Sequence, residues 1–144
     1  MAIAPFGILG GGKIRTDAEE QRRIESGEGG RSFFVGDWKR TPEERKICAE
    51  LEKVANEVGV KSITSIAIAW AMQKAPYVFP IIGGRKVEHL HQNIEALSIH
   101  LTAEQIKQLD DIVPFKKGFP YNIYVSVLFT ELWTAFLIFF FCCA

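Results

Sequence analysis

Two short apolar segments, each ending in glycines, most constrain the fold of this chain. One spans residues 2–9 and stops at residues 10–12, which are all glycine, and the other spans residues 77–82 and stops at Gly83-Gly84. Apolar runs of this length bounded by glycine are typical of buried strands. Because helical patterns separate them, the two strands are expected to form a parallel sheet through a right-handed crossover. In such sheets ligands bind at the carboxyl ends of the strands, where both glycine runs fall.

Four helical patterns accompany these segments. The first has the clearest start, because residues 41–44 combine an N-cap threonine, a proline at the first helical position and a capping-box glutamate, and Gly59 ends it. The other three helices are expected over residues 62–75, 87–97 and 103–112. The helix over residues 87–97 is expected to turn Leu90 and Ile94 toward the protein interior.

The segment between the first strand and the first of these helices predicts a long mobile loop. Residues 13–40 mix charges with glycines and show no sustained hydrophobic period. The residues before it, 7–14, have the spacing of a phosphate-binding loop, but Ile14 stands where that motif needs a hydroxyl for magnesium. The motif must also run directly into a helix, which a loop does not provide. The sequence therefore argues against nucleotide hydrolysis.

Length limits the fold further. Two parallel strands do not make a self-sufficient sheet, because both edges expose unpaired backbone groups. A parallel barrel of eight β/α units needs roughly 250 residues, whereas this chain has 144. The predicted fold class is therefore α/β, as the C-terminal fragment of a (β/α)8 TIM barrel that holds its last two β/α units with extra helices. An apolar C-terminal tail, helical or disordered, is expected to follow it.

Charge divides the chain into two parts. Lys and Arg number 17 and Asp and Glu number 17, but only Glu131 is charged between Gly118 and Ala144. We therefore expect a partial barrel over residues 1–120 and an apolar tail over residues 121–144. Three interpretations of the tail compete: a membrane anchor, a segment buried or covered by a partner, and translated sequence that belongs to no folded domain. Glu131 opposes membrane insertion, and the third is favoured because the tail lacks turn signals, a basic flank after the apolar run and a polar end.

Charge and cysteine content also bear on partners and location. The net charge of zero and the absence of a basic block argue against a nucleic-acid partner. The first residues lack the basic leader and apolar core of a signal peptide, so a cytoplasmic location is expected, with a tail-anchored one as the alternative. Cys48, Cys142 and Cys143 match neither a disulfide framework nor metal-ligand spacing, which predicts free thiols.

The segment that follows the second strand is the richest in chemistry. Gly83-Gly84 supplies flexible backbone, and Arg85 and Lys86 supply two cations immediately before a helix. Backbone N–H groups and the helix dipole attract an anion, Arg85 can bind it through two hydrogen bonds, and Lys86 adds a point charge. This combination suits a phosphate. The alternative is that the two cations only solvate the start of a helix.

Helical spacing brings further polar side chains to the same side. Arg85, His89 and either Gln92 or Asn93 lie three to four residues apart, where a base or a ribose could hydrogen-bond to them. The alternative for Asn93 is a local cap or pair. His89 and His91 are two residues apart and face different directions, so no metal site is expected. No pairing of a nucleophile with a base is evident either.

These motifs resemble those of the aldo-keto reductases, most closely the fungal aryl-alcohol dehydrogenase and norsolorinic acid reductase branch. The resemblance covers roughly residues 1–120 and is densest over residues 2–13 and 78–99. Residues 1–13 resemble the seventh barrel strand of the family and the loop after it. Residues 79–97 resemble its eighth strand and the helix that holds the adenosine 2′-phosphate of NADP.

The resemblance implies an NADP site with two groups of contacts. Pyrophosphate-side contacts are implied for the backbone of Ile3, Ala4, Pro5, Phe6 and Gly7 and for Lys13. Contacts to the 2′-phosphate and the adenine are implied for Gly83, Arg85, His89, Gln92 and Asn93, with Lys86 beside them. His89 stands where relatives often have glutamine.

The resemblance also implies what the chain lacks. The catalytic aspartate, tyrosine, lysine and histidine of the family come from the first half of the barrel, so no catalytic residue is expected here. We therefore expect a truncated member of an NADP-dependent family that reduces aldehydes and ketones, without turnover of its own. The alternative is a non-enzymatic NADP-binding or regulatory fragment, either paired with a complementary barrel fragment or a second copy, or tethered to a membrane by residues 123–144.

Overall fold

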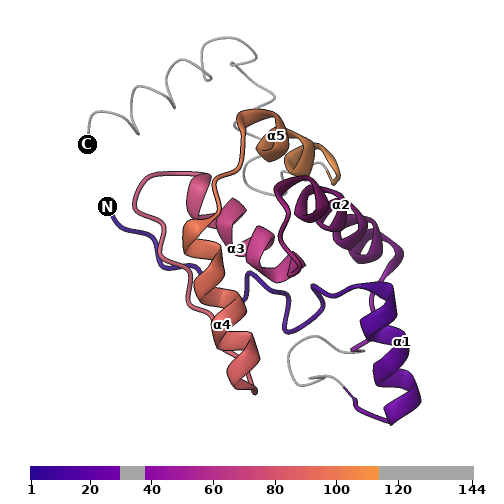
Figure 1. Ribbon diagram of the computed structural model, residues 1–144. Helices are drawn as coiled ribbons and strands as arrows, with labels where there is room; N and C mark the ends of the chain where they lie inside the picture. Colours follow the sequence, from indigo (N-terminus) through magenta and orange to yellow (C-terminus); the bar gives the residue numbers. More distant parts are fainter. Residues whose placement is uncertain (30–37, 114–144) are drawn as a thin grey trace, which may run out of the picture. The chain divides into compact units, whose positions relative to one another are not determined.

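A computed structural model of the chain describes residues 1–29 and 38–113 (Figure 1). Residues 1–113 form one compact unit. The elements, in chain order, are α1 (Asp17–Ser26), α2 (Pro42–Val58), α3 (Ile63–Gln73), α4 (Val87–Glu95), a single 3-10 turn η1 (Ala96–Ser98) and α5 (Ala103–Asp111). The expected apolar tail over residues 121–144 lies outside the described residues.

The two apolar segments pair with each other in parallel, as their sequences predict. Ile3 bridges Val78 and Phe6 bridges Ile81, both in the parallel sense. The N–H of Ile3 donates to the carbonyl of Tyr77 at 2.9 Å. The parallel pairing is confirmed, but the two continuous strands are not: the described residues contain isolated bridges and no named strand.

Proline explains why the pairing is interrupted. The N–H groups of Phe79 and Ile81 donate to the carbonyls of Ile3 and Pro5, each at 2.8 Å. In a parallel ladder the residue that accepts from Ile81 also donates to the other segment, and Pro5 has no N–H to donate. Pro80 removes no hydrogen bond from the ladder, because it lies between Phe79 and Ile81, the two residues of its segment that donate. One ladder hydrogen bond is therefore missing at Pro5.

Helix α2 forms as its cap predicts. The N–H of Glu44 donates to Thr41 Oγ1 at 3.2 Å, and the N–H of Thr41 donates to a Glu44 carboxylate oxygen at 2.7 Å. These reciprocal bonds satisfy backbone donors that the first helical turn leaves without partners. Gly59 ends the helix with φ of 81°, a left-handed conformation that favours glycine.

Helix α3 forms the centre of the described unit. It lies between α2 and α4 (Figure 1) and packs against both. The core that it shares with α2 and the segment after α4 contains Cys48, Leu51, Val54, Ala55, Ile63, Ile66, Ala67, Ala69, Ile99 and Leu101. An apolar helix of this kind needs cover on several sides, which α2 and α4 supply.

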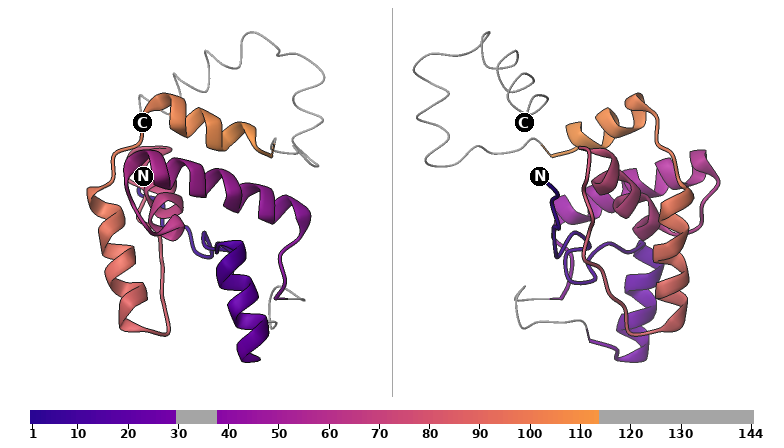
Figure 2. Two further views of the ribbon diagram at one scale, coloured as in Figure 1. Left: turned by 45° about the vertical axis from the view of Figure 1, so that its right-hand side comes forward. Right: turned by 90° about the vertical axis from the view of Figure 1, so that its left-hand side faces the viewer.

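Polar side chains on α3 fix the elements that follow it. The Gln73 side chain donates to the carbonyl of Ile99 at 2.8 Å and accepts from the N–H of Leu101 at 3.0 Å. The Trp70 indole donates to Asp110 on α5 at 3.0 Å. These bonds hold the connection from η1 to α5, and α5 lies along α2 (Figure 2).

Helix α4 is present, but its orientation differs from the expectation. Leu90 and Ile94 were expected to face inward, yet they are 56% and 53% exposed, whereas Asn93 and Ala96 are buried. The reason is the contact with α3, where Ser65 Oγ donates to the carbonyl of Gln92 at 2.8 Å. This contact turns the side of α4 that carries Asn93 toward α3 and leaves its apolar stripe without cover among the described residues.

The expectation of a structureless loop over residues 13–40 was wrong in part, because the segment contains α1. Thr16 Oγ1 accepts from the N–H of Glu19 at 3.2 Å as the N-cap, and Gly27 ends the helix in the left-handed conformation. The helix has no apolar stripe, since its sequence is almost entirely polar. Hydrophobic periodicity therefore gave no signal for it.

A buried cluster of charges, rather than apolar contacts, holds α1 in place. Arg15, Glu20 and Arg40 are only 2%, 3% and 6% exposed. Two nitrogens of Arg15 and one of Arg40 donate to the same carboxylate oxygen of Glu20, at 2.6 to 3.0 Å. Arg45 on α2 donates to the other oxygen at 2.7 Å. One carboxylate thus joins three segments of the chain.

The same cluster joins both ends of the segment that contains α1. Arg15 donates to the carbonyls of Gly12 at 2.9 Å and Trp38 at 2.7 Å, and its guanidinium lies 5.1 Å from the centre of the Trp38 ring. Arg40 donates to the carbonyl of Arg15 at 2.6 Å. Residues 12–15 and 38–40 therefore meet at the base of the segment.

In the part of the chain that the structure describes, no helix combines the length and the apolar character needed to cross a bilayer.

We expect Glu20→Gln to lower the free energy of unfolding by about 3–5 kcal/mol, because the change removes the anion that two buried guanidinium groups share. Arg15 then has no carboxylate partner, and Arg40 keeps only that of the exposed Asp17. Glu19→Gln is the matched control: Glu19 pairs with Arg23 one turn away on the surface of the same helix. Its loss is expected to cost at most about 1 kcal/mol. Urea denaturation followed by circular dichroism measures both, and equal losses would contradict the role of the cluster.

The cluster also predicts how stability depends on pH. Burial alone would raise the pKa of Glu20, but hydrogen bonds from Arg40 and Arg15 outweigh it and hold that pKa below its ordinary value of 4.5. As the pH falls, Glu20 therefore takes up a proton in the unfolded chain before it does so in the folded chain. The stabilisation from the ionised carboxylate is complete above the ordinary pKa and is lost as the pH falls through the lowered pKa of the folded chain. Urea midpoints between neutral and acidic pH are expected to fall less steeply for Glu20→Gln than for the unchanged chain.

Candidate functional site

The start of α4 leaves backbone donors available to a ligand. Lys86 precedes the helix in an extended conformation, with φ of −124° and ψ of 152°, and no side chain caps the first turn. The N–H of His89 makes a hydrogen bond of 3.2 Å to the carbonyl of Lys86. Uncapped N–H groups at a helix N-terminus, together with the helix dipole, favour an anion. The glycine pair before Arg85 leads the chain directly to this point.

The two cations of this loop have no anionic partner within the described residues. Arg85 and Lys86 are exposed, and neither makes an ion pair or a side-chain hydrogen bond there. Arg15 and Arg40, by contrast, are buried against Glu20, whereas Arg22, Lys61 and Lys107 are exposed and unpaired among the described residues as well. Arg85 and Lys86 are therefore available to bind an anion at the start of α4.

The polar residues expected further along α4 differ in their exposure. Gln92 is exposed and His89 is half-buried. Asn93 is only 8% exposed, and its side chain makes no hydrogen bond with any residue that the structure describes. Burial of an amide without a hydrogen bond costs free energy. The alternative of a local cap or pair for Asn93 is therefore not seen in the described residues.

Asn93 opens into an apolar hollow between α3, α4 and the second apolar segment. The hollow has a volume of about 250 Å³ and is lined by Ile68, Met72, Phe79, Pro80, Ile82, Asn93, Ile94 and Leu97. Asn93 is the one polar side chain in this lining. In the described residues no fully enclosed side-chain nitrogen or oxygen lacks a partner, so the unpaired Asn93 amide keeps some exposed surface.

The first apolar segment presents mainly backbone. Ile3, Ala4, Phe6 and Gly7 are exposed and Pro5 is half-buried. After this segment the chain turns tightly, since the N–H of Gly10 donates to the carbonyl of Gly7 at 2.8 Å. All three glycines at residues 10–12 have φ in the left-handed region, which residues with a side chain rarely adopt. The turn explains the glycine run that follows the segment.

Lys13, the remaining expected site residue, lies against α2. It is 9% exposed, and its Nζ donates to both carboxylate oxygens of Glu44 at 2.9 and 3.1 Å. Burial alone would raise the pKa of Glu44, but the N–H of Thr41 and the ammonium group of Lys13 outweigh it and keep that pKa below its ordinary value. The structure therefore joins Lys13 to the N-terminal turn of α2 rather than to the loop before α4.

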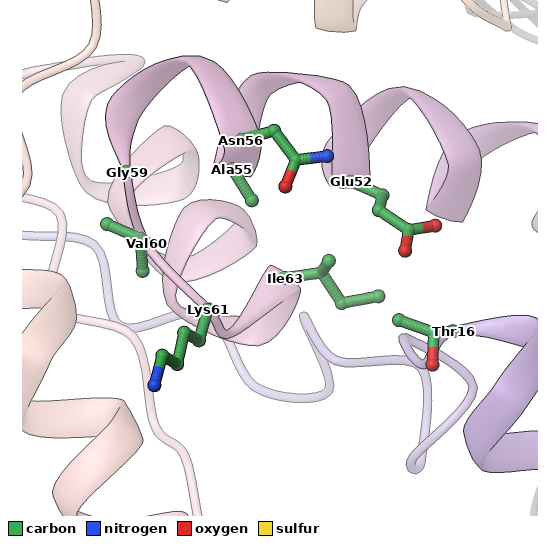
Figure 3. A pocket seen from close by; sticks show the side chains of 8 residues that line it. All are labelled: Thr16, Glu52, Ala55, Asn56, Gly59, Val60, Lys61 and Ile63. Atoms are coloured by element: carbon green, nitrogen blue, oxygen red, sulfur yellow. The ribbon is translucent and has the colours of Figure 1, made fainter.

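A second hollow was not anticipated from the sequence. It has a volume of about 400 Å³, and Figure 3 labels the residues that line it: Thr16, Glu52, Ala55, Asn56, Gly59, Val60, Lys61 and Ile63. It forms where the chain turns from α2 into α3, and none of the expected cofactor residues lines it. Thr16 is already used as the N-cap of α1. No motif in the sequence marks this turn as a site.

In the described part of the chain no group of three His, Cys, Asp or Glu side chains is arranged to hold a metal ion.

Comparison with known proteins gives consistent matches. The profile of the aldo/keto reductase family matches residues 1–114. The aryl-alcohol dehydrogenase (NADP+) of Phanerodontia chrysosporium is 63% identical over 125 residues, which are 86% of this chain and 32% of that protein. A Saccharomyces cerevisiae protein whose name places it among the aryl-alcohol dehydrogenases is 54% identical over 122 residues, or 85% of this chain and 80% of that protein.

A third relative extends the match to another fungus. An aldo-keto reductase of Aspergillus calidoustus is 45% identical over 123 residues, which are 85% of this chain and 31% of that protein. The chain thus spans 32% and 31% of the length of two of these relatives but 80% of the length of the third.

The buried amide yields a test that needs no ligand. We expect Asn93→Leu to raise the free energy of unfolding by about 1 kcal/mol, because it replaces an unpaired amide with an apolar side chain in an apolar hollow. Asn56→Leu on the exposed side of α2 is the control, with an expected change within about 0.5 kcal/mol. Chemical denaturation measures both. A loss of stability in Asn93→Leu would mean that the amide is hydrogen-bonded in the folded chain.

Proposed function

Because this chain belongs to the aldo/keto reductase family, we propose that it supplies the adenosine end of an NADP site in an oxidoreductase of the aryl-alcohol dehydrogenase type, which reduces aldehydes and ketones. The family match over residues 1–114 supports the class of reaction. The relative from Phanerodontia chrysosporium, named for NADP+, supports the choice of cofactor. The fold of the family is a (β/α)8 barrel, and we assign this chain to its last two β/α units, in the cytosol.

The observation that carries this proposal is the loop before α4. Arg85 and Lys86 have no anionic partner among the described residues, and they precede a helix whose first turn has no side-chain cap. A phosphate monoester matches both features, because it takes two hydrogen bonds from a guanidinium group and further ones from backbone N–H groups. Arg85 and Lys86 would hold the 2′-phosphate, with the backbone of Gly83 beside them.

The polar side of α4 would hold the adenosine. His89 and Gln92 lie one and two turns into the helix and make no side-chain hydrogen bonds with described residues. The buried amide of Asn93, which also lacks a partner, has the donor and acceptor that an adenine edge requires. An unpaired amide at a buried position such as Asn93 is costly in the free chain, and a bound nucleotide would satisfy it.

The pyrophosphate would lie at the end of the first apolar segment. We propose that the backbone of residues 3–7 contacts it, as in the resemblance from which this assignment comes. Lys13 would also contact it, but this requires a change, since its ammonium group is bound to Glu44. Lys13 must either leave Glu44 or be shared between the carboxylate and the phosphate. The fit is therefore better for the 2′-phosphate than for the pyrophosphate.

On the proposed assignment to the last two β/α units, the reaction itself would use residues from other units of the barrel. Bound NADPH provides the hydride that reduces the carbonyl carbon. Proton transfer to the carbonyl oxygen needs a positioned acid, and the family takes its catalytic aspartate, tyrosine, lysine and histidine from the first half of the barrel. We assign no catalytic role to any residue of this chain.

The remaining β/α units would cover the apolar surface of α4. Val87, Leu90, Ile94 and Leu97 form a stripe along the helix and are between 53% and 68% exposed. Phe79 and Ile81 on the second apolar segment are each 61% exposed. In a closed barrel these side chains and the open backbone edges of both segments pack against neighbouring strands and helices. We propose that the other barrel units are the partner of this surface.

We expect Arg85→Ala to weaken NADPH binding by about 10- to 100-fold, the effect of one lost charge-assisted contact. Binding of NADH, which lacks the 2′-phosphate, is expected to stay unchanged. Arg22→Ala, at an exposed position on α1, is the control and is expected to affect neither. Isothermal titration calorimetry with NADPH and with NADH measures the dissociation constants of the unchanged chain and of both variants. Equal loss for both cofactors would contradict a 2′-phosphate contact at Arg85.

We also expect no reductase turnover from the chain alone. NADPH oxidation in the presence of a panel of aryl aldehydes is expected to stay at background, because the proposed assignment puts the acid that protonates the carbonyl oxygen on another unit of the barrel. Activity that follows the purified chain through successive columns, and is lost in Arg85→Ala, would contradict this expectation.

A further inference from the structure

Gly84 lies closer to a side chain than do Gly10, Gly12 and Gly83, which also lie in the loops of the two apolar segments. A Cβ atom added at this position would lie 2.5 Å from Cβ of His89, 3.1 Å from its Nδ1 and 3.2 Å from its Cγ. Added Cβ atoms at Gly83 and Gly29 would meet nothing within 4 Å. The backbone at residue 84 is not in the left-handed region. Contact with His89, and not backbone conformation, therefore requires glycine here.

The contact cannot be relieved by a small movement. The nearest atom is the Cβ of His89, which is fixed to the backbone of the first turn of α4, so no rotation of the imidazole removes the collision. A side chain at residue 84 would have to displace either the loop that carries Arg85 and Lys86 or the first turn of the helix. The absence of a side chain at Gly84 thus sets the position of His89 relative to the two cations.

The imidazole is oriented as well as positioned. Its Nδ1 edge is turned toward Gly84, as the 3.1 Å distance shows. His89 makes no side-chain hydrogen bond within the described residues, so Nε2 is left to meet a ligand. An imidazole N–H is a hydrogen-bond donor, and a phosphate monoester accepts several such bonds. Arg85, Lys86 and His89 together offer three donors of different geometry at one helix start.

From this geometry we propose that Gly84 is a positioning residue for cofactor choice: by holding His89 beside Arg85, it sets the preference for a dinucleotide that carries a 2′-phosphate over one that lacks it. The inference rests on the proposed NADP site. It goes further because it assigns part of the preference to Gly84, which has no side chain with which to contact the cofactor.

The test compares the ratio of the dissociation constants for NADH and NADPH in the full chain and its variants. We expect Gly84→Ala to lower this ratio by about tenfold, the effect of one misplaced charge-assisted hydrogen bond. His89→Ala is expected to lower it equally, and NADH binding is expected to stay unchanged in both. The controls are Gly29→Ala, where an added Cβ meets nothing, and His91→Ala, an exposed imidazole on the same helix. Both controls are expected to keep the original ratio.

A double variant separates positioning from a general defect in folding. Because the collision involves the His89 Cβ, His89→Gly removes it, whereas His89→Ala does not. Gly84→Ala is therefore expected to change the ratio no further when it is introduced into His89→Gly. If Gly84 supported the fold through contacts other than the one with His89, Gly84→Ala would weaken the binding of both dinucleotides and would do so in either background.

The outcomes distinguish this inference from the function on which it rests. If the unchanged chain prefers NADPH and either Gly84→Ala or His89→Ala keeps that preference, the role of Gly84 is wrong and the proposed function stands. If the unchanged chain binds neither dinucleotide, the proposed function is wrong and this inference fails with it. Should Gly84→Ala not fold, as judged by circular dichroism, His89→Ala alone decides between these results.

Discussion

The arrangement of the candidate site depends on the parallel backbone pairing between residues 3–6 and residues 77–81. Hydrogen bonds from Ile3, Phe79 and Ile81 join two segments that are more than seventy residues apart in the chain. Because the pairing is parallel, both segments end at the same edge, and both continue into glycines there. The turn at residues 10–12 and the loop before α4 therefore leave this edge together. Pro5 weakens the pairing by one hydrogen bond, so other contacts must help to hold it.

The helical core supplies that support and also determines which side of α4 is available. Helix α3 packs against α2 and α4, and Ser65 on α3 binds the backbone of α4 at Gln92. This contact buries Asn93 and leaves Leu90 and Ile94 exposed. Of the polar residues proposed for the adenosine, Asn93 lies on the side that packs against the core, whereas Gln92 is exposed. The apolar stripe lies on the side that the rest of a barrel would cover.

Local signals in the sequence predicted local structure well. The capping box at Thr41 places the start of α2, because the side chains that cap a helix lie within three residues of the groups they bind. Helix α1 was not predicted, because a charged cluster stabilises it and hydrophobic periodicity does not indicate such contacts. Glu20 on this helix pairs with Arg40, which lies 20 residues away in the chain, and no local sequence pattern encodes such a pairing.

The site was predictable to a similar extent. The run from Gly83 to Asn93 marks the loop and the helix correctly, because glycines, cations and a helix start are adjacent in the sequence. The bond between Lys13 and Glu44 spans 31 residues and was not foreseeable. The orientation of α4 was misjudged, since an apolar stripe indicates that a face needs cover without showing which element covers it.

The central claim, that the loop before α4 and the polar side of that helix hold a 2′-phosphorylated adenosine, is tested most directly by mapping amide chemical shifts during titration with adenosine 2′,5′-bisphosphate. This probe carries the adenine and the 2′-phosphate without the nicotinamide. The account predicts saturable shifts at the amides of residues 83–89 and at the side-chain amide of Asn93, and smaller ones with adenosine 5′-monophosphate. Shifts centred on residues 59–63, around the other hollow, or identical responses to both nucleotides would contradict it.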